Sequence, residues 1–257
     1  MLKRTLSTLV LAPAFLCAIW FGFPYFHIFV GALSLLALME LIIITTVGGL
    51  NVHRSFILLS FLIGTIFISL GQHSVALALF IIGGLIAILS ITNSVKDMIW
   101  LGFGYFYLTI GLIALIEMRA LSDIGHKAVL WFFAVIWAND IGAYLIGRQF
   151  GSARIAPRIS PGKTWAGAFG GLAFAALVSC AFYGNFPLVQ NITLLVLFGV
   201  GLGIGAQVGD LLESYFKRIY GIKDSGALIP GHGGALDRSD SILFTAPITL
   251  FLLLFNI

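Results

Sequence analysis

The sequence has little charge and almost no cysteine. Only 9% of its 257 residues are charged, and it contains 2 cysteines and 7 prolines, whereas 60% of the residues are hydrophobic and Phe occurs 23 times. Soluble domains carry about 25% charged residues, so an ordinary water-soluble globular protein is excluded. Cys17 and Cys180 lie far apart in apolar segments, which argues against a disulfide framework and against a thiolate metal site.

Long apolar stretches dominate the chain, and its mean hydropathy is +1.09. A transmembrane helix needs about 20 apolar residues. About nine stretches approach this length: residues 6–22, 25–47, 55–70, 74–91, 98–116, 128–146, 165–184, 190–213 and 241–257. Barrel strands would alternate apolar and polar residues, which runs such as LLALMELIIITTV do not. We therefore predict an all-α polytopic membrane protein with about nine transmembrane helices.

The basic residues predict the orientation of these helices. Lys3 and Arg4 precede the first apolar stretch, which we expect to be a retained helix rather than a cleaved signal peptide. If the N-terminus is cytoplasmic, 12 of the 14 basic residues face the cytoplasm. Arg119 and Lys127 fall on the opposite side. The net charge of +4 then reflects loop bias, and we expect no nucleic-acid partner. Two polar loops, about 147–164 and 217–240, share the cytoplasmic face.

No linker or internal repeat divides the chain. We therefore expect a single integral membrane domain, 1–257. Within it, residues 1–130 would form N-terminal transmembrane helices, and residues 131–257 would form the region that carries the polar motifs.

The eighth predicted span ends in a polar stripe. Six polar residues recur there at spacings of three and four, which places them on one helical face: Gln207, Asp210, Glu213, Ser214, Lys217 and Arg218. Each ionisable group at membrane depth costs about 2.5–3.5 kcal/mol on insertion scales, so these groups indicate a functional site or, alternatively, an internal ion pair with Lys217.

The sixth span ends similarly, with Asn139 and Asp140 followed by Tyr144 and Arg148. This spacing favours a second acidic stripe near the cytoplasmic face. A contact between Asp140 and Tyr144 within the helix is the alternative.

A glycine-rich segment precedes Asp237, Arg238 and Asp240. Carboxylates that lie close in sequence suit Mg²⁺, which usually takes one or two carboxylates together with phosphates and water. Basic residues nearby would bind phosphate oxygens, and His232, which has no partner at zinc-ligand spacing, would donate a hydrogen bond. The segment therefore indicates metal-assisted phosphate chemistry, with a solvated charge run as the alternative.

Gly162, Lys163 and Thr164 look like the end of a Walker A loop. The first glycine of that motif would fall at position 157, which is Pro157. The segment SPGKTWAG therefore needs another explanation.

The run Ser214–Asp240 resembles the signature of phosphatidate cytidylyltransferases, also called CDP-diglyceride synthases. The matching residues are Ser214, Phe216, Lys217, Arg218, Lys223, Asp224, Gly226, Pro230, His232, Gly233, Gly234, Asp237, Arg238 and Asp240. Ala235 and Ser239 replace bulkier apolar residues. The segments NDIGAYLIGRQFG, APRISPGKTWAG and GDLLES extend the resemblance, with Ile141 in place of Thr and Ala166 in place of Glu.

The resemblance implies transfer of a cytidylyl group from CTP to phosphatidate, giving CDP-diacylglycerol and pyrophosphate. It assigns Mg²⁺, with a second cation left open, to Asp210, Asp237 and Asp240. It assigns catalysis to Lys217, Arg218, Lys223, Asp224, His232, Asp237 and Arg238. Substrate binding would involve Asn139, Asp140, Ser160, Lys163, Thr164, Ser214, Gly233 and Gly234.

The expected partners are CTP, phosphatidate and membrane lipid, and the resemblance leaves a homodimer open. It also implies a bacterial inner membrane with the active site facing the cytoplasm. Two alternatives stay open: a CTP-dependent enzyme for another lipid phosphate, such as an isoprenoid ether lipid, and an anion transporter. A transporter would usually show two related halves, whereas the polar motifs lie in the second half alone.

Overall fold

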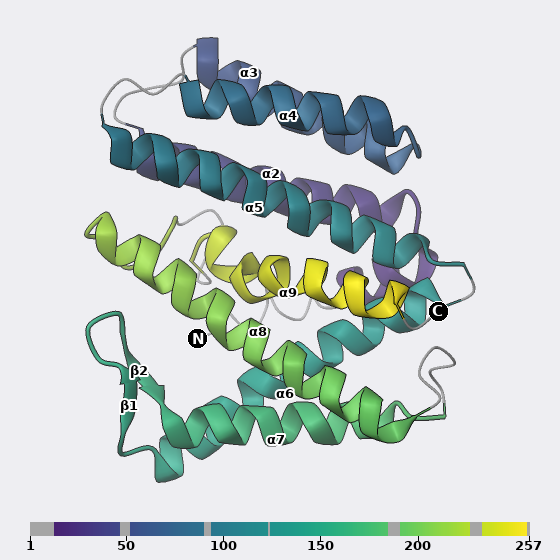
Figure 1. Ribbon diagram of the computed structural model, residues 1–257, viewed down its shortest axis with the longest axis vertical. Helices are drawn as coiled ribbons and strands as arrows, with labels where there is room; N and C mark the ends of the chain where they lie inside the picture. The colour runs from purple at the N-terminus through teal and green to yellow at the C-terminus, as the bar shows by residue number, and fades with distance from the viewer. Residues whose placement is uncertain are drawn as a thin grey trace. The chain divides into compact units, whose positions relative to one another are not determined.

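The computed structural model describes residues 13–46, 52–89, 94–122, 124–184, 191–226 and 233–255. Most of these residues are helical, turns and short irregular stretches join the helices, and the two described strands form one short hairpin (Figure 1). Residues 13–21 are helical, and the later helices are α2 (Tyr25–Thr45), α3 (Val52–Ser69), α4 (His73–Leu89), α5 (Val95–Ala120), α6 (Gly125–Phe150), α7 (Trp165–Ala181), α8 (Ile192–Ile219) and α9 (Leu236–Leu254). Each predicted span therefore contains helix.

Five of the described helices are long and apolar enough to cross a membrane: α2, α3, α5, α6 and α8. Helices α4 and α7 are apolar but have 17 residues each. A helix rises about 1.5 Å per residue, so about 20 residues cross a hydrocarbon core of about 30 Å. The architecture is consistent with a polytopic membrane protein, while the count of nine spans and their orientation stay predictions.

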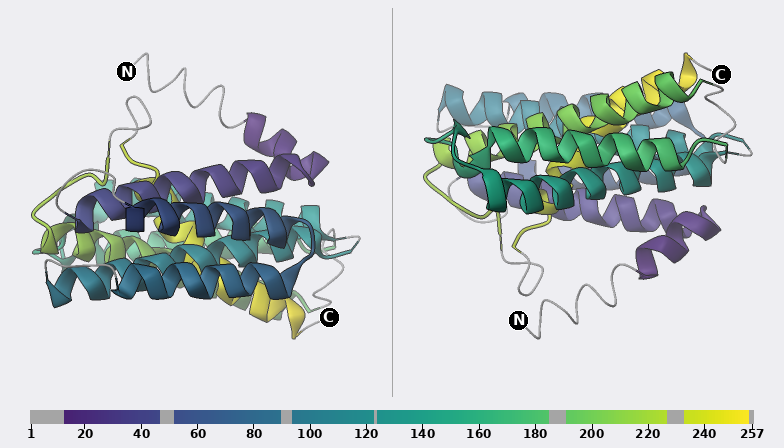
Figure 2. Two further views of the ribbon diagram at one scale, coloured as in Figure 1. Left: turned by 90° about the horizontal axis from the view of Figure 1, so that it is seen from above. Right: turned by 90° about the horizontal axis from the view of Figure 1, so that it is seen from below.

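The first polar segment is not the loop that the sequence predicts. Helix α6 continues to Phe150, and an antiparallel hairpin follows, formed by β1 (Arg154–Ala156) and β2 (Ser160–Thr164) (Figures 1 and 2). Arg154 pairs with Thr164, and Ala156 pairs with Ser160. Strands of three and five residues are too short to produce a clear alternating pattern, which is why the sequence did not indicate them.

The second polar segment is also shorter than predicted. Helix α8 continues to Ile219, and α9 begins at Leu236 rather than near residue 241. Asp237, Arg238 and Asp240 therefore lie in the first two turns of α9. Charged residues at this position look like loop residues in a hydropathy profile, although they continue the helix.

The chain divides into two compact units, which are described separately. The first contains residues 1–116 and 220–239, and the second contains residues 117–219 and 240–257. The single-domain organisation stays a prediction. In the first unit, α3 packs against α2 and α4. The ring of Phe61 lies 5.7 Å from that of Phe80 and 5.8 Å from that of Tyr105, both in edge-to-face geometry.

The second unit is built on α6, α7 and α8, with α7 against both neighbours. Small residues allow the helices to approach closely, as is common in membrane helix packing. A Cβ atom on Gly142 would lie 2.8 Å from the carbonyl oxygen of Gly170. A buried hydroxyl joins all three helices: Ser179 accepts from Trp131 Nε1 at 3.0 Å and donates to the Leu195 carbonyl at 2.7 Å.

We predict that Ser179→Ala lowers the free energy of unfolding by about 1–2 kcal/mol, because it removes the acceptor from a buried indole N–H. Thermal unfolding of the purified protein in detergent measures the effect. Cys180→Ala is the matched control, because the neighbouring Cys180 is exposed. Equal melting temperatures for the two variants would contradict the role assigned to Ser179.

Candidate active site

A cavity of about 340 Å³ in the second unit collects several of the predicted site residues. Its walls come from α6, the β1–β2 hairpin, the start of α7 and the second half of α8. Five residues proposed from the sequence line it: Asn139, Asp140, Lys163, Thr164 and Asp210. The structure thus brings together residues that are as much as 71 positions apart in the sequence.

Lys163 and Asp210 form an ion pair in this cavity. Lys163 Nζ lies 2.6 Å from Asp210 Oδ2 and donates to the Gln207 carbonyl at 3.4 Å. Asp140 and Asp240 both interact electrostatically with the negative charge of Asp210 and with the positive charge of Lys163. Asp240 is only 8% exposed. Asp140 and Asp210 line the cavity and Asp240 does not, but Lys163 lies near all three carboxylates.

Amide side chains hold Asp140 in position. Gln207 Nε2 donates to Asn139 Oδ1 at 2.9 Å and to the Ala168 carbonyl at 3.1 Å. Asn139, which is 1% exposed, donates through Nδ2 to Asp140 Oδ1 at 3.3 Å. These bonds connect α6, α7 and α8 within the wall of the cavity. The predicted contact between Asp140 and Tyr144 is replaced by a hydrogen bond from Arg148 to the Tyr144 hydroxyl at 3.2 Å.

The junction between β2 and α7 positions Lys163. Thr164 is the N-cap residue of α7, and its Oγ1 accepts from the Gly167 N–H at 3.1 Å. Threonine is favoured at this position because its side chain satisfies an amide at the helix start. The cap fixes where the strand ends, and with it the position of Lys163. The resemblance to a Walker A loop is therefore explained by a strand and a capped helix.

Other predicted residues of the second unit contact protein groups. Ser214 Oγ donates to Asp210 Oδ1 at 3.3 Å, and Arg218 Nε donates to the Ile159 carbonyl at 3.1 Å. Lys217 Nζ lies 2.6 Å from Glu213 Oε2, which confirms the alternative of an internal ion pair for Glu213. Ser160 begins β2. Their roles toward a substrate stay predictions.

The first unit holds the remaining described residues of the signature: Lys223, Asp224, Gly226, Gly233, Gly234, Asp237 and Arg238. Asp237 Oδ2 accepts from the backbone N–H groups of Ser225 and Gly234, both at 3.0 Å. Gly233 has φ +86°, a conformation that favours glycine. His232 lies outside the described residues.

The start of this segment is held by α5. Tyr220 donates its hydroxyl to Asp97 Oδ1 at 2.8 Å, and Lys96 Nζ lies 4.4 Å from the centre of its ring. Burial and the hydrogen bond to Asp97 raise the pKa of the Tyr220 phenol above its ordinary value. Tyr220 therefore stays a neutral donor.

Comparison with known proteins identifies the family of the chain. The model of the Cytidylyltransferase family matches residues 2–256. The chain belongs to this family. It is therefore a nucleotidyltransferase, and membership of an enzyme family removes the transporter alternative.

Relatives with a more specific name cover much of the chain. The phosphatidate cytidylyltransferase of Brucella suis biovar 1 is 33% identical over 245 residues, or 95% of this chain and 90% of that protein. The protein of the same name in Staphylococcus epidermidis is 42% identical over 154 residues, covering 60% of this chain and 55% of its own. That of Rickettsia bellii is 41% identical over 158 residues, covering 57% and 68%.

The donors of this cytidylyltransferase fit a hard cation. No group of three or more His, Cys, Asp or Glu side chains within the described ranges is arranged to hold a metal ion. Mg²⁺, however, usually takes one or two protein carboxylates and completes its shell with water and substrate phosphates. Asp210, with a side chain 42% exposed at the cavity, provides a suitable oxygen donor. Asp240 lies near enough to interact with its charge.

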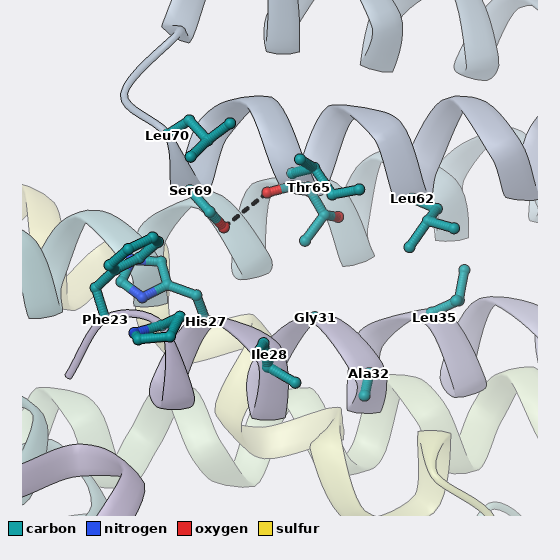
Figure 3. Close-up of a pocket in the computed structure, with 12 residues that line it drawn as sticks. Phe23, His27, Ile28, Gly31, Ala32, Leu35, Leu62, Thr65, Ser69 and Leu70 are labelled. Carbon is teal, nitrogen blue, oxygen red and sulfur yellow. Dashed lines mark hydrogen bonds between the residues drawn. The ribbon is translucent and has the colours of Figure 1, made fainter. Parts of the chain in front are cut away.

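A second cavity, in the first unit, has a different character (Figure 3). It measures about 390 Å³ and is lined by α2 and α3 together with Phe23, Pro24 and Leu70. Its polar side chains are His27, Thr65 and Ser69, and Ser69 donates to the Thr65 carbonyl at 2.7 Å. None of the predicted site residues of the cytidylyltransferase lines it. The cavity that contains Lys163 and Asp210 is therefore the candidate active site.

Two residues central to the described geometry were absent from the predicted site. Gln207 belonged to the predicted polar stripe, but its hydrogen bond to Asn139 joins residues 68 positions apart, and no sequence pattern predicts such a contact. Glu40 received no role, although a carboxylate inside an apolar span is a functional signal by default. That signal was available in the sequence.

Proposed function

We propose that this cytidylyltransferase is a phosphatidate cytidylyltransferase that transfers CMP from CTP to phosphatidate. The observation that carries the proposal is the similarity to a protein of that name over 95% of this chain and 90% of the relative. The lipid phosphate oxygen would attack the α-phosphorus of CTP, the bond to the pyrophosphate oxygen would break, and CDP-diacylglycerol and pyrophosphate would leave. The alternative acceptor is another lipid phosphate, such as an isoprenoid ether lipid.

Positioning and charge neutralisation are the main tasks of a protein in phosphoryl transfer. No protein nucleophile is required, because the acceptor phosphate is already anionic near neutral pH. Lys163 would bind phosphate oxygens in the cavity, with Lys217, Arg218, Lys223 and Arg238 as further predicted phosphate ligands. The amide groups of Asn139 and Gln207 would keep Asp140 and the helices around it in place.

Asp210 and Asp240 would hold Mg²⁺, and Asp237 stays a third predicted ligand. When bound, the ion would neutralise charge that develops on the departing pyrophosphate. Lys163 is paired with Asp210 in the structure. A substrate phosphate that forms an ion pair with Lys163 would free Asp210 to bind a cation. Binding of the anion and binding of the cation would therefore favour each other.

The predicted bacterial inner membrane and a cytoplasmic active site are part of this proposal. Bacterial relatives support the membrane, and five apolar helices support integral insertion. CTP is available on the cytoplasmic side.

The direct test is an assay of the purified protein in detergent micelles with phosphatidate, CTP and MgCl₂. We expect release of pyrophosphate and formation of CDP-diacylglycerol, identified by mass spectrometry. An isoprenoid ether lipid phosphate tested in parallel separates the two acceptors. Absence of product with phosphatidate, at every lipid and metal concentration tested, would refute the proposal.

We predict that Lys163→Met reduces turnover by about 100-fold, because loss of one preorganised charge at a reacting phosphate typically costs this much. Lys163→Arg retains the charge and is expected to keep more activity. Arg158→Met, an exposed residue in the hairpin turn, makes the same change of charge outside the cavity. If Lys163→Met and Arg158→Met have equal turnover, Lys163 does not bind substrate.

We predict that EDTA abolishes turnover and that Mg²⁺ restores it. Asp210→Asn is expected to raise the half-saturating Mg²⁺ concentration about tenfold, because an amide oxygen binds a hard cation less strongly than a carboxylate. The control is Glu117→Gln, the equivalent change of a carboxylate to an amide at a residue of α5 outside the cavity. An unchanged Mg²⁺ dependence in Asp210→Asn would remove this residue from the metal site.

A further inference from the structure

Glu40 is a buried carboxylate in the second half of an apolar helix. It lies in α2, within the run LLALMELIIITTV, and is 2% exposed. A carboxylate at this depth is expensive unless it is hydrogen-bonded. Its partners lie almost 200 positions later in the sequence, at the start of α9.

Three hydrogen bonds link Glu40 to the signature segment. Oε1 accepts from the Ala235 N–H at 2.9 Å, and Oε2 accepts from the Leu236 N–H at 3.0 Å. Oε2 also accepts from the Ser225 hydroxyl at 2.8 Å. All these residues belong to the first unit. One side chain of α2 thus joins Ser225 to the beginning of α9.

The first backbone N–H groups of an α-helix have no partners within the helix. At the start of α9, the N–H groups of residues 234–237 all have acceptors. Glu40 takes those of Ala235 and Leu236, and Asp237 Oδ2 takes that of Gly234. Ser225 Oγ accepts from the Asp237 N–H at 3.4 Å. We call Glu40, Ser225 and Asp237 the α9 cap.

Two glycines of the signature make room for Glu40. A Cβ atom on Gly226 would lie 2.5 Å from Glu40 Oε1. A Cβ atom on Gly234 would collide with both Glu40 Oε2 and Ser225 Oγ. Neither position therefore accepts a side chain while the carboxylate is in place. Glu40 thus accounts for the glycine at position 226, and Glu40 together with Ser225 accounts for the glycine at position 234.

We propose that Glu40 is a positioning residue for the reaction: through the α9 cap it sets the geometry of Ser225 and Asp237, and hence the binding of CTP and Mg²⁺. This inference rests on the proposed function. Glu40 itself lies outside the signature, in α2. Its described hydrogen bonds come from two backbone N–H groups and one hydroxyl, which suits a residue that positions the segment. A carboxylate also suits the positive end of the α9 dipole.

The test uses Glu40→Gln and Gly226→Ala in the full-length protein in detergent. Glutamine keeps the size of Glu40 but replaces one acceptor oxygen by a donor, and alanine displaces the carboxylate. Glu117→Gln, the same substitution at a carboxylate of α5, is the matched control for the first change. Gly201→Ala is the control for the second, because a Cβ atom there meets nothing within 4 Å.

The first measurement is hydrogen–deuterium exchange of peptides that cover residues 234–237. We expect at least tenfold faster exchange in Glu40→Gln and Gly226→Ala, and rates within twofold of the parent protein in both controls. Unchanged exchange in Glu40→Gln would overturn the proposal. This measurement needs no turnover, so it decides on the α9 cap even if the protein shows no activity on phosphatidate.

The second measurement is the half-saturating concentration of CTP at a fixed, saturating Mg²⁺ concentration. We expect it to rise about tenfold in Glu40→Gln. A purely structural role would reduce the amount of active protein and lower the maximal rate, with half-saturation unchanged. Half-saturation within twofold of the parent protein would therefore overturn the positioning role, whatever happens to the rate.

Discussion

Every polar group in this chain must find its partner within a protein that is 60% hydrophobic. In a lipid environment neither a backbone amide nor a carboxylate has water as a substitute partner. Glu40 shows the consequence most clearly, because its burial is compensated by the N–H groups at the start of α9 and by the Ser225 hydroxyl. Helix α9 in turn begins at Leu236 because those groups have acceptors. One constraint thus determines both the position of a side chain and the end of a helix.

The same constraint shapes the candidate active site. Gln207 donates to Asn139 and to the Ala168 carbonyl, and Asn139 donates to Asp140, so these polar groups of the cavity wall are paired. Asp140, Lys163 and Asp210 are the charged residues that line the cavity, and the last two are paired with each other. Their pairing leaves both charges compensated and both side chains within reach of a substrate. Such groups can exchange partners without leaving an uncompensated buried charge.

The sequence predicted a structural feature correctly where a single local pattern determines that feature. Apolar length predicted helices, and the spacing of Asp210, Ser214 and Lys217 predicted a polar face that continues along α8. It was uninformative where partners are distant: no local pattern relates Glu40 to Ala235, or Asn139 to Gln207. It was misleading at boundaries, since hydropathy placed the start of α9 near residue 241. The charged first turn there is stabilised by acceptors from elsewhere in the chain.

The two departures from the signature can now be understood physically. Ala235 and Ser239 are both fully buried, and Ser239 Oγ donates to the Ala235 carbonyl at 2.9 Å. The hydroxyl is thereby satisfied within α9, as burial of a polar group requires. Ala235 meanwhile presents its N–H to Glu40. These substitutions change packing next to the α9 cap without removing any of its hydrogen bonds, so an effect on the lipid acceptor would have to act through shape rather than through charge.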